Sequence, residues 1–272
     1  KPEAATANNP VPCDLAVTAA APYDVAFCDT CIGGSTVAAN LALPGLRAFY
    51  LADYVVNPLG TRSDGEVRAA LERWIGIAET QAPIIVIACN TASVRLEGAP
   101  RPPGLFTMVD LFDHALASER EHVAGKRICL MGTEFTVASP VYADRLDTAG
   151  EVVRLGATLT ERTIAHLEHT TPEGRQGIVD EIGDVITNTE AVALVCTCFP
   201  LIGELIAEIN PGIHQLDPGR AIRDIADWPD REGENHLTVA VTGKTVPAGD
   251  VRNHASELFP GWDRVEVVSR AD

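Results

Sequence analysis

The chain has 272 residues, of which 46% are hydrophobic, and a formal net charge of −17 at pH 7. That length is enough for one large domain or two small ones, and either can bury a full apolar core. The negative charge argues against nucleic acid as a partner, because phosphate groups are bound by clustered positive charge. A small acidic molecule is not excluded, because local dipoles and hydroxyl groups can bind it against a distant field.

No segment approaches the roughly 18 consecutive apolar residues of a membrane-spanning helix, so we expect no membrane partner. Residues 1–21 are rich in Ala, Pro and Asn, lack the apolar core of a secretory signal, and are expected to form a flexible N-terminal arm. The chain has seven cysteines, and an odd number with several in tight clusters argues against a disulfide framework. We therefore expect a cytoplasmic protein.

Apolar runs typical of strands alternate with helical patterns along the chain. The first part has a predicted strand at 23–28, a helix at 35–41, a strand at 47–52, a helix at 63–79 and a strand at 83–89. A Pro-rich crossover at 98–104 precedes a strand at 127–132, a helix at 136–146, a strand at 151–155, a helix at 176–188 and a strand at 191–196. The last part has strands at 237–243 and 265–269 with a helix between them. This alternation predicts an α/β fold with parallel sheets.

Cys89 and Cys196 each end an apolar run that is typical of a buried strand. A buried cysteine is usually an inert core residue. Here, however, Cys89 is followed by Asn90 and Thr91, and Cys196 is followed by Thr197. Small polar residues at a strand-to-helix turn expose backbone N–H groups, which bind carboxylates and lower the pKa of a thiol. Ligands of α/β folds bind at the carboxyl ends of strands, so we interpret the two cysteines as facing half-sites for moving a proton from one face of a carbon to the other.

Further polar residues stand at other predicted strand ends. Asp29 and Thr30 precede paired glycines, Thr133 follows the strand at 127–132, and Gly60 lies in a turn where its N–H can face an anion. Ordinary helix capping is the alternative explanation for the hydroxyl of Thr133.

Two cysteine spacings raise the question of metal or redox chemistry. Cys28-x-x-Cys31 and Cys196-x-Cys198 are close spacings of the kind found in zinc sites and redox pairs. The strand pattern, however, turns Cys28 toward the interior of the sheet and leaves Cys31 in the following loop. We therefore assign no metal ligand and keep the metal or redox interpretation as an alternative.

Taken together, these residues resemble the aspartate/glutamate racemase superfamily, and within it glutamate racemase, over about residues 25–268. The resemblance is carried by D-T-C-I-G-G-S-T-V at 29–37, Y-L-A-D at 50–53, N-P-L-G-T-R-S at 57–63, A-C-N-T-A-S at 88–93, M-G-T-E-F-T-V-A-S at 131–139, V-C-T-C-F-P-L-I at 195–202 and L-D-P-G-R-A at 216–221. The two cysteine motifs are specific to the family, whereas the glycine segment alone is not.

The resemblance implies two similar α/β lobes, each a mainly parallel sheet flanked by helices, with the active site in the cleft between them. The first lobe would comprise residues 22–105 together with 217–272, and the second would comprise 106–216. The implied activity is that of a cofactor-independent racemase or epimerase, acting on a small acidic amino acid or dicarboxylate. No cofactor and no metal would take part, and we consider a homodimer as its assembly.

The resemblance also implies roles for individual residues. Cys89 and Cys196 would be the two acid/base thiols, one removing the Cα proton and the other delivering a proton to the opposite face. The residues implied to bind substrate are Asp29, Thr30, Leu59, Gly60, Asn90, Thr91, Thr133, Thr197 and Cys198.

The chain departs from the family pattern at the inferred substrate site. Cys198 stands where the family has a histidine that is thought to assist the second cysteine, and Cys31 stands where it has a glycine. Thr30 replaces a serine and Leu59 replaces a tyrosine, while Glu161 is a candidate for a glutamate that some members place in the second lobe. These changes leave two alternatives open. One is an isomerase or decarboxylase of a small dicarboxylate or modified amino acid, and the other is a non-catalytic homologue that binds metal or undergoes redox chemistry through its cysteines.

Overall fold

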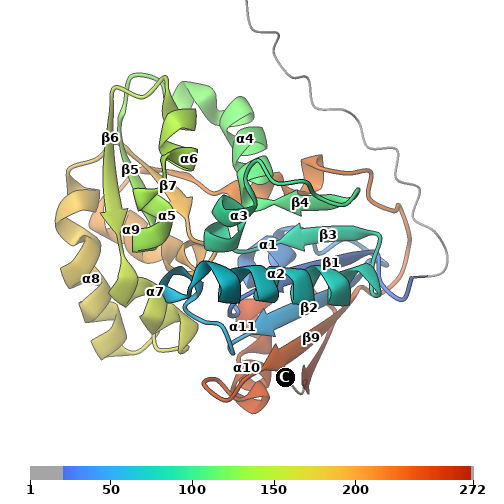
Figure 1. Ribbon diagram of the computed structural model, residues 1–272. Helices are drawn as coiled ribbons and strands as arrows, with labels where there is room; N and C mark the ends of the chain where they lie inside the picture. Colours follow the sequence, from blue (N-terminus) through green and yellow to red (C-terminus); the bar gives the residue numbers. More distant parts are fainter. Residues whose placement is uncertain (1–20, 271–272) are drawn as a thin grey trace, which may run out of the picture.

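The computed structural model describes residues 21–270 (Figure 1). All but the last residue of the predicted N-terminal arm lie outside this range. Two separate sheets organise the described chain, and every strand pairing in both of them is parallel. The predicted α/β fold with two similar parallel-sheet lobes is therefore confirmed.

The larger sheet has six strands in the order β10-β9-β2-β1-β3-β4. Its strands are β1 (Val25–Asp29), β2 (Arg47–Asp53), β3 (Ile84–Ile87), β4 (Leu105–Thr107), β9 (His236–Thr242) and β10 (Arg264–Ser269). The last two strands come from the end of the chain and extend the sheet beyond β2. The central strand β1 is buried along its whole length, as its continuous apolar sequence predicts for a parallel strand covered on both faces.

The smaller sheet has four strands in the order β6-β5-β7-β8. Its strands are β5 (Arg127–Gly132), β6 (Glu151–Gly156), β7 (Ala191–Val195) and β8 (His214–Leu216). The predicted lobe boundaries stay a prediction. The boundary between 105 and 106 falls inside β4, which pairs with β3 and so belongs to the larger sheet.

Helices cover both faces of each sheet (Figure 1). In the larger sheet, α2 packs on the face that carries Cys28, whereas α1 packs on the opposite face that carries Phe27. The helices are α1 (Ser35–Asn40), α2 (Asp64–Glu79), α3 (Asn90–Leu96), α4 (Met108–Glu119), α5 (Glu134–Ala138), α6 (Pro140–Ala143), α7 (Thr158–Ala165), α8 (Pro172–Thr187), α9 (Gly203–Ile209), α10 (Ala248–Asn253) and α11 (Ala255–Leu258). Short 3₁₀ turns are η1 (Leu59–Thr61), η2 (Arg120–His122), η3 (Asp144–Leu146), η4 (Phe199–Ile202) and η5 (Pro218–Asp224).

One apolar cluster runs through both lobes. It joins residues such as Phe27 and Val86 of the larger sheet to Met131 and Leu194 of the smaller one. The opposite face of the smaller sheet packs against α4 and α6, with Phe112 and Tyr142 in edge-to-face contact. The two lobes therefore share buried apolar surface, which holds the ends of their strands close to one another.

The structure differs from the predicted elements in several places. The helix predicted at 136–146 is broken into α5 and α6, because Ser139 caps a new helix that has Pro140 at its first turn. A proline inside a helix lacks an N–H donor and clashes with the preceding turn, whereas it fits the first turn well. The strand predicted at 83–89 ends at Ile87, and Cys89 becomes the N-cap of α3. The elements β4, α4, α7, β8 and α9 were not predicted.

Among the described residues, no helix combines the length and the apolar character that crossing a membrane requires.

The start of α2 provides a test of local stability. The Ser63 hydroxyl accepts a hydrogen bond from the Glu66 backbone N–H, and the Glu66 carboxylate accepts one at 2.9 Å from the Ser63 N–H. Replacing Ser63→Ala removes the acceptor, so we expect urea denaturation to show a loss of about 1 kcal/mol in the free energy of unfolding. Ser63→Asp keeps an acceptor oxygen and should retain most of the stability. Equal losses in the two variants would contradict this role of the cap.

Candidate active site

A cavity of about 400 Å³ lies between the two sheets. The larger sheet contributes residues that follow β1 and β3, and the smaller sheet contributes residues that follow β5 and β7. All the site residues predicted from the sequence line this cavity, namely Asp29, Thr30, Leu59, Gly60, Cys89, Asn90, Thr91, Thr133, Cys196, Thr197 and Cys198. The position is the one expected for parallel α/β sheets, in which ligands bind beyond the carboxyl ends of the strands.

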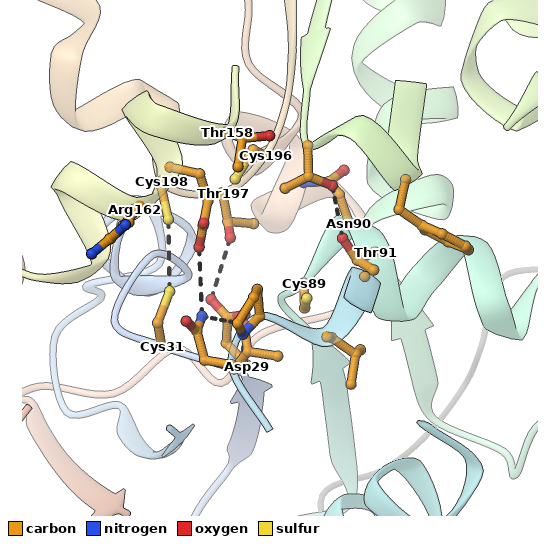
Figure 2. Close-up of a pocket in the computed structure, with 18 of the residues that line it drawn as sticks. Asp29, Cys31, Cys89, Asn90, Thr91, Thr158, Arg162, Cys196, Thr197 and Cys198 are labelled. Carbon is orange, nitrogen blue, oxygen red and sulfur yellow. Dashed lines mark hydrogen bonds between the residues drawn. The ribbon is translucent and has the colours of Figure 1, made fainter. Parts of the chain in front are cut away.

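The two predicted catalytic cysteines enter the cavity from different sheets. Cys89 follows β3 and caps α3, whereas Cys196 directly follows β7. Figure 2 shows Cys196, Thr197 and Cys198 on one side of the pocket, with Asp29 and Cys89 on the other side. Cys89 is 6% exposed and Cys196 is 7% exposed, so each thiol is buried in the protein and borders the same cavity.

Asp29 is the centre of the hydrogen-bond network on the first side. One carboxylate oxygen accepts from the Thr30 N–H at 2.7 Å, and the other accepts from the Gly34 N–H at 2.7 Å. The second oxygen also accepts from the Thr197 hydroxyl at 3.3 Å, which comes from the other lobe. Burial raises the pKa of Asp29 to about 7, although these hydrogen bonds and one from the Cys89 thiol oppose the shift.

The pKa of Cys89 corrects an expectation from the sequence. We expected the strand-to-helix turn to lower it, and the Ala92 N–H does act in that direction. Burial is the largest cause, however, and the negative charge of Asp29 adds to it, so the pKa of Cys89 lies well above its usual range. Desolvation of the thiolate outweighs the N–H groups because the sulfur is almost out of contact with water.

Asn90 carries a hydrogen-bond donor without a partner. Its side-chain oxygen accepts from the Tyr142 hydroxyl at 2.6 Å, and Tyr142 belongs to α6 of the second lobe. The side-chain nitrogen of Asn90 is buried and makes no hydrogen bond with any of residues 21–270. An orphaned buried donor is costly, and in a cavity wall it indicates a position where a ligand acceptor can bind.

Hydroxyl groups gather on the neighbouring wall. The Oγ1 atom of Thr91 in α3 lies 3.1 Å from the Oγ1 atoms of both Thr133 and Thr136, which belong to the start of α5 in the second lobe. Thr133 also caps α5, so the capping role that we considered for it coexists with its place in the cavity wall. Gly60 packs closely on Phe135, and a Cβ there would lie 3.0 Å from the Phe135 Cβ. The residue therefore lets η1 approach α5 across the cleft.

Cys198 and Cys31 meet across the cleft. Their sulfur atoms are 3.6 Å apart, and the contact is drawn as a dashed line in Figure 2. Hydrogen bonds with Cys196 and with Cys31, followed by burial, raise the pKa of Cys198 well above its usual range. The Cys198 contact lowers the pKa of Cys31, but burial and the charges of Asp29 and Glu161 outweigh it and raise that pKa to about 11.

The structure separates the cysteines of the Cys28-x-x-Cys31 pattern, as the strand alternation predicted. Cys28 points to the α2 side of the sheet, where its thiol contacts the Trp74 carbonyl at 3.8 Å. Cys31 belongs to the apolar cluster on the other side and lines the cavity. The two residues therefore do not form one site.

Several cavity residues were missed in the sequence analysis. The cavity wall also contains Asn57, Pro58, Thr61, Glu134, Phe135, Thr158, Arg162, His166, Val195 and Thr245. Arg162 follows Glu161 on α7, a helix that was not predicted, and lines the same cavity as Cys198 (Figure 2). Within residues 21–270, Arg162 forms no ion pair with an acidic side chain. The amphipathic pattern of residues 158–165 is the sequence signal from which Arg162 could have been predicted.

The raised pKa of Cys89 is open to measurement by alkylation. Because only the thiolate reacts, we expect the alkylation rate of Cys89, followed by mass spectrometry, to keep rising above the usual thiol pKa of about 8.5. Asp29→Asn removes a charge that raises the pKa of Cys89, so in this variant the increase in alkylation rate should occur at lower pH. Asp180→Asn on the outer side of α8 is the matched charge control and should change nothing. A rate that levels off below pH 8 in the unaltered protein would contradict the assignment.

The chain is similar to known proteins both in sequence and in fold. No protein-family model matches the chain. A glutamate racemase of Streptococcus pyogenes is 24% identical over 214 residues, which cover 74% of this chain and 80% of that protein.

Solved structures share the fold. The structure of glutamate racemase from Thermus thermophilus in complex with β-chloro-D-alanine matches with a TM-score of 0.68 at 23% identity, covering 91% of this chain and 97% of that one. The aspartate racemase of Picrophilus torridus matches with a TM-score of 0.55 at 20% identity, covering 72% of this chain and 88% of that one. The chain is therefore similar in sequence to glutamate racemases, and it shares its fold with solved glutamate and aspartate racemases.

Proposed function

We propose that this protein is a cofactor-independent racemase of a small acidic amino acid, with Cys89 and Cys196 as its acid/base pair. The observation that carries the proposal is that two buried thiols, one from each sheet, line a single cavity. Racemisation at Cα needs a base on one face of the carbon and an acid on the other, and two thiols can fill both roles. The sequence relatives and the solved structures are named as glutamate and aspartate racemases.

The cavity offers groups for each part of such a substrate. The unpartnered side-chain nitrogen of Asn90 is placed to donate to the α-carboxylate, with the hydroxyls of Thr91 and Thr133 on the same wall. The Asp29 carboxylate is the acceptor for the ammonium group. Arg162, a cation of the cavity wall without an ion-pair partner among the described residues, is the group that we assign to the distal carboxylate.

The reaction consists of two proton transfers. The thiolate of one cysteine removes the Cα proton and becomes a thiol, and the electron pair of the broken C–H bond remains on the substrate as a carbanion. The thiol of the other cysteine then delivers its proton to the opposite face and becomes a thiolate. For the direction in which Cys89 is the base, its proton passes to Asp29, which accepts a hydrogen bond from the Cys89 thiol. The carbonyl oxygen of the neutral acid then still accepts from the ammonium group.

The raised pKa of Cys89 has two opposing consequences. The thiolate is scarce at neutral pH, which limits the fraction of protein ready to act as a base. Once formed, the thiolate is a strong base, because a thiol that holds its proton tightly yields a more basic conjugate. The second side differs, since Cys198 replaces the family histidine and its own raised pKa keeps it a neutral thiol. Cys198 can hydrogen-bond to Cys196 but cannot carry a charge as an imidazolium does.

The comparisons with known proteins do not favour the alternative activities. The named relatives are racemases, so the comparisons lend no support to a decarboxylase or to a non-catalytic protein. A homodimer and a cytoplasmic location remain predictions from the sequence.

Hydrogen exchange at Cα tests the proposal directly. In heavy water, the protein should exchange the Cα proton of a D- or L-acidic amino acid and interconvert the enantiomers, with glutamate and aspartate compared side by side. Cys89→Ser and Cys196→Ser should each lower racemisation at least about 100-fold, because each removes an acid/base group. Cys129→Ala is the control, since Cys129 is buried in β5 away from the cavity. If no acidic amino acid exchanges, or if the two serine variants remain fully active, the proposal is wrong.

Tyr142 provides a test of substrate positioning. Its hydroxyl fixes the orientation of the Asn90 amide. Tyr142→Phe should therefore raise KM about 10-fold, which corresponds to the free energy of roughly one hydrogen bond, and should change kcat less. The effect should be absent when Asn90→Ala is already present, because both changes act through the same amide. Additive effects of the two changes would show that Tyr142 acts independently of Asn90.

A further inference from the structure

Two departures from the family pattern meet in space. Cys31 and Cys198 stand where the family has a glycine and a histidine, and they lie 167 positions apart in the sequence. Their sulfur atoms are nevertheless 3.6 Å apart, and their residues are 2% and 1% exposed. In the proposed reaction, neither of these two thiols carries the transferred proton.

An acidic group completes the cluster. A carboxylate oxygen of Glu161 lies within 4.8 Å of both sulfur atoms. Glu161 is 8% exposed, and its carboxylate accepts one long hydrogen bond of 3.5 Å from the Asn57 amide. Among the ion pairs of residues 21–270, none joins Glu161 to a basic side chain. A buried carboxylate with so little compensation is expensive, which favours a cation at this place.

The spacing of the sulfur atoms fits metal coordination better than a disulfide. Zinc–sulfur bonds are about 2.3 Å long, so two thiolates on a tetrahedral ion lie about 3.8 Å apart. A disulfide requires about 2.05 Å, which is far shorter than the 3.6 Å found here. The loop also orients the thiol, because the Gly33 N–H donates to the Cys31 sulfur at 3.3 Å. Hydrogen bonds of this outer kind orient and tune metal-bound ligands.

We propose that Cys31, Glu161 and Cys198 form a binding site for a thiophilic divalent cation, of which Zn²⁺ is the representative. Two sulfur ligands and one carboxylate oxygen form a donor set that suits zinc and disfavours Mg²⁺ or Ca²⁺. Three protein ligands leave a further coordination position for water or a small ligand from the cavity, which all three residues line. This revises the assignment from the sequence, in which no residue was a metal ligand.

The proposed metal site would connect three segments that line the cavity. Cys31 lies in the loop between β1 and α1, Glu161 lies on α7, and Cys198 lies between β7 and η4. A bound cation would therefore link the two lobes and stabilise the folded protein by mass action. This inference does not depend on the racemase activity, and it is tested without any substrate.

Metal binding by the full-length protein is the test. The protein is prepared under reducing conditions, stripped with a chelator, and titrated with Zn²⁺, and separately with Co²⁺ to observe thiolate-to-metal charge-transfer absorption. We expect one ion per chain, the absorption of a cobalt–thiolate centre, and an increase in Tm with Zn²⁺. Cys31→Gly, which restores the family residue, and Cys198→Ala should each weaken binding by at least about 100-fold, the upper end of the effect of outer-shell changes. Glu161→Gln should also weaken it.

Two variants serve as controls for the metal-binding measurement. Cys28→Ala and Cys129→Ala each remove a buried thiol outside the cavity and should bind metal like the unaltered protein. The proposal is overturned if the protein takes up no stoichiometric metal, or if Cys31→Gly and Cys198→Ala bind it as tightly as the unaltered chain. It is equally overturned if no metal binds and oxidised glutathione converts Cys31 and Cys198 to a disulfide, which would make the pair a redox site. Racemase assays play no part in these outcomes, so failure of either proposal is recognised separately.

Discussion

The buried carboxylate of Asp29 is the interaction on which the arrangement of the site depends. It closes the loop after β1 by accepting from two backbone N–H groups, and it reaches the second lobe through the hydroxyl of Thr197. Thr36 adds a second link, because its hydroxyl donates to the Thr197 carbonyl at 2.9 Å. These contacts hold the end of β1 and the loop after it against the loop that carries Cys196, which fixes the position of one half of the cavity relative to the other.

The same carboxylate sets the electrostatics of the cavity. Burial raises the pKa of Cys89, and the charge of Asp29 adds to this effect. At Cys31 the hydrogen bond with Cys198 lowers the pKa, but burial and then the charge of Asp29 raise it. Asp29 itself has a pKa of about 7, which is below that of Cys89, so the proton that the two groups share rests on the thiol. On the second side, Cys196 has the thiol of Cys198 as a hydrogen-bonding neighbour. The two halves are therefore similar in fold and different in chemistry.

Much of the fold follows from local sequence patterns, whereas the details of the site do not. Buried strands such as β1 and β7 are visible as apolar runs, and the cysteines at strand ends could be placed at one sheet edge because parallel strands share their direction. The helix α7 was missed because its sequence is rich in threonine, and with it Arg162 was missed as a cavity residue. The pKa of Cys89 was predicted in the wrong direction because burial is a property of the whole fold. The contact between Cys31 and Cys198 is likewise a product of chain topology, which no spacing rule reveals.

The central claim is that one substrate carbon binds between the two sulfur atoms, and a structure with a bound acidic amino acid tests it most directly. We expect the Cα atom to lie between Cys89 and Cys196, with a carboxylate oxygen on the Asn90 amide and the ammonium group on Asp29. An acidic amino acid bound with both sulfur atoms on the same face of Cα, or bound outside the cavity, would contradict the account.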